Sequence, residues 1–102
     1  MVEVKVAYDK GRVRIEMNGH SGYGKKGEDI VCAGISGVLQ FVIIHFFNNL
    51  RRDGNFKLSN GVGFVEVMLK EEDRDLISSF IEYLKLVEKS YPNSLRIDVV
   101  NK

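Results

Sequence analysis

The first residues of the chain alternate between apolar and polar side chains. Apolar residues recur at a spacing of two on both sides of Asp9-Lys10-Gly11, namely Val2, Val4, Val6 and Tyr8 before it and Val13, Ile15 and Met17 after it. A period of two around a glycine-containing turn is typical of a β-hairpin. A second hairpin is predicted around the turn pair Asn60-Gly61. Phe56 and Leu58 precede this turn, and a strand that we expect to be largely buried follows it over Val62 to Leu69.

Two longer segments have helical patterns. The segment from Ile30 to Leu50 is apolar on nearly every face, and Asp29 stands where an N-cap is expected. Its length and hydropathy would also suit a membrane span, but Gln40 and His45 within it favour a core helix of a soluble domain.

Glu71 to Ser90 is amphipathic, with acidic residues in its first turn, and Pro92 ends it before a last strand over Leu95 to Val99. The predicted order is therefore ββαββαβ. We expect an α+β fold over the single domain 1–102, with a mainly antiparallel mixed sheet packed with two helices, one of them central and very apolar.

Composition narrows the possible functions. The 102 residues are 44% hydrophobic and 28% charged, and the formal net charge of +1 argues against a dedicated nucleic-acid surface. The lone cysteine, Cys32, excludes an internal disulfide and any CxxC cluster. The first residues show no signal-peptide pattern, so we expect a cytoplasmic protein with no membrane partner.

The segment Gly19 to Glu28 holds four glycines and predicts a mobile surface loop. Its spacing matches two nucleotide-binding patterns by chance. In the first, Gly19 to Lys25, Lys26 replaces the Ser or Thr that would hold magnesium. The second, Gly22-x-Gly24-x-x-Gly27, lacks the parallel βαβ unit that a dinucleotide site needs. The sequence therefore does not favour nucleotide binding.

The candidate chemistry lies at the two ends of this loop. If Asp29 caps the helix, Cys32 lies in its first turn, where free N–H groups favour a thiolate and could stabilise an oxyanion. Position alone leaves a buried structural cysteine equally open. His20 could act as the base, or it could be a loop histidine with no role. Asp29 could also orient His20, and Ser36 lies one turn after Cys32 on the same face.

Two further possibilities carry less weight. His45 lies far along the apolar helix from this cluster, which predicts a core or interface histidine. A zinc site built from His20, Cys32 and Asp29 lacks a fourth ligand at a recognisable spacing, so we expect no metal and no cofactor.

At these residues the sequence resembles the ribosomal-processing cysteine protease family, called Prp. The resemblance rests on Gly19-His20, the variable loop, and Gly27-Glu28-Asp29-Ile30-Val31-Cys32-Ala33-Gly34-Ile35-Ser36, and it extends over essentially the whole chain. Ser21 is a departure, because the family more often has Ala at this position.

The resemblance implies a specific activity. Such proteases remove the short N-terminal extension of the bacterial large-subunit ribosomal protein twenty-seven during ribosome assembly, and they form homodimers. It implies a catalytic dyad of His20 and Cys32 with Asp29 and Ser36 in support, and a substrate loop formed by Gly19, Ser21, Gly22, Tyr23, Gly24 and Gly27.

Two other classes of function stay open. An exposed sheet edge could make the chain a non-enzymatic module that binds a peptide strand. An accessible cysteine is also easily oxidised, so Cys32 could serve a thiol redox sensor. Loss of turnover with retained peptide binding after Cys32→Ala distinguishes the protease from the binding module.

Overall fold

The computed structural model describes residues 1–19, 29–59 and 62–101. Over these residues it has the predicted element order: β1 (Val2–Asp9), β2 (Arg12–Gly19), α1 (Ile30–Ile43), a π-helical turn (Ile44–Asn49), β3 (Gly54–Ser59), β4 (Val62–Met68), a 3-10 turn (Glu71–Asp73), α2 (Arg74–Ser90) and β5 (Leu95–Asn101). The α+β prediction and the ββαββαβ order are confirmed.

The strands of the described residues form one sheet in the order β3-β4-β2-β1-β5. β1 pairs antiparallel with β2 and parallel with β5, and the other neighbours are antiparallel, so the sheet is mixed as predicted. The β1–β2 turn has two residues with positive φ, Lys10 at 51° and Gly11 at 78°. A two-residue turn with both φ values positive matches the twist of the paired strands and fixes their register.

The alternation in the sequence separates the two faces of the sheet. The inner face carries the apolar residues, and with both helices it forms the core: Val2, Val4, Val6, Val13, Ile15, Met17, Val31, Ile35, Leu39, Val42, Ile43, Phe46, Val65, Val67, Ile77, Phe80, Leu84 and Leu95. The outer face is polar, and there Arg14 pairs with Glu66 at 3.0 Å and lies over the ring of Phe64. Within the described ranges the core therefore lies on one face of the sheet.

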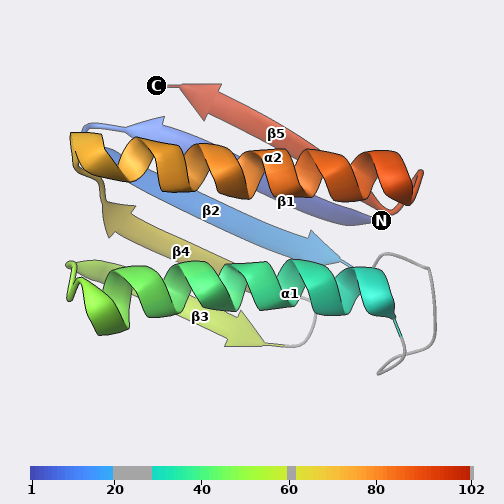
Figure 1. Ribbon diagram of the computed structural model, residues 1–102, viewed down its shortest axis with the longest axis horizontal. Coiled ribbons are helices and arrows are strands. Elements are labelled where there is room, and N and C mark those ends of the chain that lie inside the picture. The colour runs from blue at the N-terminus through green and yellow to red at the C-terminus, as the bar shows by residue number, and fades with distance from the viewer. Residues whose placement is uncertain (20–28, 60–61, 102) are drawn as a thin grey trace.

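Both helices lie on the inner face, α1 over β3 and β4 and α2 over the half of the sheet that contains β5 (Figure 1). The helix predicted to be central thus lies beside α2, over one half of the sheet. Because no helix of the described residues covers the other face, β4 is buried mainly on one side. Val62 and Met68 are exposed, and the prediction of a largely buried strand over Val62 to Leu69 was wrong in this respect.

The helical stretch Ile30–Asn49 is long and apolar enough to cross a membrane by length and composition alone, as the core helix of a soluble protein also can be. Here its inner side packs on the sheet through Val31, Ile35, Leu39, Val42 and Phe46. The prediction of a helix that contributes to the core is therefore confirmed. Its outer side stays apolar and exposed, with exposed fractions of 65% for Ile30 and 58% for Phe41.

A buried ion pair joins the end of the α1 region to the start of α2. Asp73, only 4% exposed, accepts hydrogen bonds from the Arg52 guanidinium and from the Lys70 backbone N–H at 2.7 Å. Burial alone would raise the pKa of Asp73, but the hydrogen bonds from Arg52 and Lys70 prevail and lower it. Arg52 also donates to the Met68 carbonyl at 3.2 Å, so this ion pair also holds the end of β4.

We expect Asp73→Asn to lower the free energy of unfolding by about 3–5 kcal/mol, because it removes the buried counter-ion of Arg52 and leaves only the exposed Glu72, 3.9 Å away. Asp75→Asn, which removes an exposed carboxylate from the same helix start, should change it by less than about 0.5 kcal/mol. Urea unfolding at pH 7 measures both variants.

The pH dependence follows from the lowered pKa of Asp73. The contribution of Asp73 is fully present above the unfolded-state pKa of about 4 and is lost as the pH falls through the lower folded-state value. Wild-type stability should therefore decline below about pH 4 more steeply than that of Asp73→Asn. Parallel declines would contradict this role of Asp73.

Candidate active site

The site is built on the first turn of α1. Asp29 is the N-cap residue, with extended backbone angles (φ −79°, ψ 101°). Its Oδ1 accepts hydrogen bonds from the backbone N–H groups of Val31 and Cys32, each at 3.0 Å, and its carbonyl accepts from Ala33 N–H at 3.0 Å. The predicted cap is confirmed, and it sets where the helix begins.

The same hydrogen bonds correct one sequence-based expectation. The first-turn N–H groups were expected to be free for an oxyanion, but those of Val31 and Cys32 are occupied by the Asp29 carboxylate. A carboxylate at the N-terminus of a helix also interacts favourably with the positive end of the helix dipole. The Asp29 carboxylate therefore occupies the place at the start of α1 where an oxyanion was expected to bind.

Cys32 is the third residue of α1. It is half-buried: it packs against the hydrophobic core on one side, and part of its surface stays accessible. A purely structural cysteine is more often fully buried. Cys32 is therefore not sealed in the core.

The contacts of α1 define which way Cys32 faces. Leu39, two turns further on and on the same side of the helix, lies over Gly63 of β4 and next to Leu58 of β3. The other side of the helix faces α2, where a Cβ on Gly34 would come within 3.0 Å of the Tyr83 hydroxyl. Cys32 thus faces away from α2 and toward the β3–β4 side.

Gly63 is a packing position that the sequence analysis did not single out. A Cβ there would approach Leu39 Cδ2 to 2.9 Å and Leu58 Cδ1 to 3.0 Å, so glycine lets α1 pack closely on β4. An isolated glycine within an apolar strand is the available signal for such a close approach. Through the packing of α1, Gly63 helps to set the height of the first turn above the sheet.

The structure describes only some of the other predicted site residues. Ser36 lies one turn after Cys32 in α1 and is half-buried, as the spacing predicted. Gly19 ends β2 with φ 106°, and a Cβ there would meet the Met1 carbonyl oxygen, so this position requires glycine. His20, Ser21, Gly22, Tyr23, Gly24 and Gly27 lie outside the described residues, and the His20/Cys32 dyad and the substrate loop stay predictions.

His45 lies in the π-helical turn, half-buried, with its ring edge-on to Phe46 at a centroid distance of 5.0 Å. It is thirteen residues from Cys32, or about 20 Å along a helix axis. It therefore lies apart from the thiol, and its core or interface role stays a prediction. In the described ranges no group of three His, Cys, Asp or Glu side chains is arranged to hold a metal ion.

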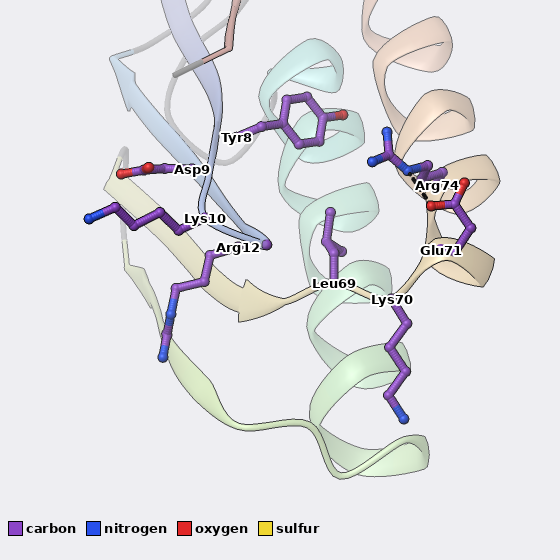
Figure 2. A pocket seen from close by; sticks show the side chains of 9 residues that line it. Tyr8, Asp9, Lys10, Arg12, Leu69, Lys70, Glu71 and Arg74 are labelled. Atoms are coloured by element: carbon purple, nitrogen blue, oxygen red, sulfur yellow. Dashed lines mark hydrogen bonds and ion pairs between the residues drawn. The ribbon is translucent and has the colours of Figure 1, made fainter.

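A cavity of about 270 Å³ lies at the opposite end of the sheet from the first turn of α1, beside the β1–β2 turn and the start of α2. Figure 2 shows the Tyr8 ring pointing toward Arg74, which is paired with Glu71 at 3.2 Å. Burial raises the pKa of Tyr8, and the Arg74 charge partly opposes this. Because neither cysteine nor histidine lines this cavity, it does not provide a nucleophile for peptide hydrolysis.

The fold and the site together fit one class of protein, the cysteine proteases: an α+β domain carries a half-buried cysteine in the first turn of a capped helix, near the positive end of the helix dipole. A comparison with protein families identifies the particular group. The model described as cysteine protease Prp matches residues 1–96, and the chain belongs to this family.

Similar proteins agree with this assignment. The ribosomal processing cysteine protease Prp of Bacillus subtilis (strain 168) is 24% identical over an alignment that covers 92% of this chain and 91% of the relative. The crystal structure of S. aureus Prp with a covalently linked product peptide has a TM-score of 0.82 at 24% identity, covering 97% of this chain and 99% of that one. SMU.848 from Streptococcus mutans gives 0.68 at 20% identity, covering 100% and 96%. At these identities the structural likenesses confirm the fold.

The cap can be tested separately from the chemistry. Asp29→Ala should lower the free energy of unfolding by about 0.5–2 kcal/mol, because two first-turn N–H groups lose their acceptor. Asp29→Asn retains a side-chain oxygen that can accept the same bonds, so it should cost much less. Urea unfolding of both variants measures this. Equal losses in the two variants would show that the charge of Asp29, and not its capping bonds, is what α1 needs.

Proposed function

We propose that this protease removes the short N-terminal extension of the bacterial large-subunit ribosomal protein twenty-seven during ribosome assembly, with Cys32 as nucleophile and His20 as its base. The observation that carries the proposal is the half-buried Cys32 in the first turn of α1, in a chain of the Prp family. The Bacillus subtilis relative is a ribosomal processing cysteine protease, and this supports the substrate class.

The proposed reaction uses the two residues in sequence. His20 accepts the thiol proton, and the Cys32 sulfur attacks the scissile carbonyl to form a tetrahedral oxyanion. Collapse of the oxyanion breaks the C–N bond, and the leaving amine takes its proton from His20. Water then hydrolyses the thioester, which releases the peptide acid and restores the thiol. The reaction requires no metal or cofactor.

The geometry of Asp29 adds a constraint to this scheme. The Cys32 N–H is a backbone donor on the nucleophile itself, but it is bound to Asp29 at 3.0 Å. In the proposed mechanism it can stabilise the oxyanion only when that carboxylate turns away. Asp29 and Ser36 are supporting residues in this scheme, and Gly19, Ser21, Gly22, Tyr23, Gly24 and Gly27 form the loop that closes over the substrate.

The activity is tested with a synthetic peptide that copies the N-terminal extension and the residues after it, analysed by mass spectrometry. We expect one cut at a single position, and Cys32→Ala should reduce turnover by at least about 10³-fold because the nucleophile is lost. His20→Ala should reduce it by about 10²–10⁴-fold through loss of general acid–base catalysis.

The chain offers a matched control in its other histidine. His45→Ala should retain turnover within about threefold, because His45 lies about 20 Å along the helix from the thiol. A peptide that Cys32→Ala still binds but the wild-type protein never cleaves would favour the non-enzymatic binding module. Oxidation of Cys32 without any cleavage would favour the redox sensor.

We also propose that the protein is cytoplasmic and forms a homodimer through the outer side of α1. The support for the dimer is an apolar surface on that helix, where the exposed fractions are 65% for Ile30, 58% for Phe41 and 50% for Ile44. Exposed apolar patches on a soluble domain commonly mark a protein–protein contact. A groove of about 140 Å³ between α1 and α2, lined by Phe41 and Tyr83 among others, extends this surface.

Light scattering after size-exclusion chromatography tests the dimer. We expect the wild-type protein to have twice the mass of the chain, and Ile44→Asp to shift it to the monomer because a charge would be buried in the contact. Val99→Asp, at a 43% exposed position on β5, is the control and should stay dimeric. A monomeric wild-type protein, or an Ile44→Asp variant that stays dimeric, would contradict the proposed surface.

A further inference from the structure

A free sheet edge lies on the side of α1 that Cys32 faces. β3 is the outermost strand on that side of the sheet, because it pairs with β4 and with no other strand among the described residues. In an antiparallel pair every second residue directs its N–H and C=O away from its partner. An edge strand is therefore a template for one more strand.

The inner-face side chains at this edge form a partly exposed apolar surface. Phe56 of β3 is 49% exposed, and its ring lies 4.8 Å from that of the half-buried Phe47 after α1. Leu58, two residues further along β3, is half-buried on the same face. The only charged residue of β3, Lys57, lies on the opposite face of the strand. An extended peptide beside β3 could place every second side chain against this surface.

The geometry of α1 connects the edge to the thiol. The side of the helix that carries Cys32 and Leu39 packs over the β3–β4 hairpin, with Leu39 and Leu58 both beside Gly63. β3 runs toward the end of the molecule that holds the first turn of α1 (Figure 1). A peptide paired with β3 can therefore continue past Ser59 toward Cys32. The other edge, β5, lies at the far side of the sheet.

We infer that the substrate peptide binds as an additional strand on the free edge of β3, with an apolar side chain resting on the Phe47–Phe56 pair. This inference rests on the proposed function, in which the peptide is cleaved at Cys32. Strand addition supplies main-chain hydrogen bonds for any extended sequence, and contacts to alternate side chains supply selectivity. The enzyme thus selects an extended peptide with an apolar residue that reaches the edge of β3.

The first test uses amide hydrogen exchange, followed by NMR, on the Cys32→Ala protein with the synthetic extension peptide. Alternate amides of β3 should exchange at least about tenfold more slowly when the peptide is bound, while those of β5 stay unchanged. Protection of β5, or peptide binding with no slowing in β3, would overturn the inference.

The second test uses active protein and needs no stable complex. Phe56→Ala should raise KM about tenfold, whereas Val99→Ala, at the other edge, should leave KM unchanged. Peptides N-methylated at single backbone positions should show raised KM at alternate positions only, since every second N–H pairs with β3. Urea unfolding of Phe56→Ala checks that the variant is folded.

The outcomes separate this inference from the proposed function. If the wild-type protein does not cleave the extension peptide, the proposed function fails. Alternatively, the wild-type protein cleaves the peptide, but neither Phe56→Ala nor any N-methylation changes KM. In that case the peptide binds elsewhere, and only the β3 inference fails.

Discussion

The capping of α1 by Asp29 is the interaction on which the account of the site depends. One carboxylate oxygen accepts two backbone hydrogen bonds that fix the first residue of the helix, and with it the height and direction of the Cys32 side chain. A shift of the α1 register by one residue would turn this position by about 100° around the axis. The sulfur would then lie in the core or in open solvent, and not on the β3–β4 side.

The rest of the fold positions this capped turn. The inner stripe of α1 packs on the sheet, and Gly63 allows Leu39 to approach β4 closely. At the other end, the buried Arg52–Asp73 pair ties the segment after α1 to the start of α2. The helix is thus held at both ends and along its length, which suits a residue that must meet a substrate at a fixed position.

Much of this arrangement was predictable from local pattern. The alternation around Lys10-Gly11 predicted the first hairpin, and Asp29 before a long apolar run predicted both the helix start and the place of Cys32 in it. What the pattern lacked was tertiary information. Nothing local indicates that both helices cover the same face of the sheet, that Val62 and Met68 are therefore exposed, or that the cap occupies the N–H of the nucleophile. His20 and its loop lie outside the described residues, so the dyad stays a prediction.

The central claim is that the Cys32 sulfur itself attacks the peptide. Its most direct test is the intact mass of the protein after the reaction with the extension peptide is quenched in acid during turnover. The account predicts a population heavier by the amino-terminal product less one water, as a thioester requires, with the added mass on the peptide that contains Cys32. Cleavage that proceeds with no such adduct, or with the adduct on another residue, would contradict it.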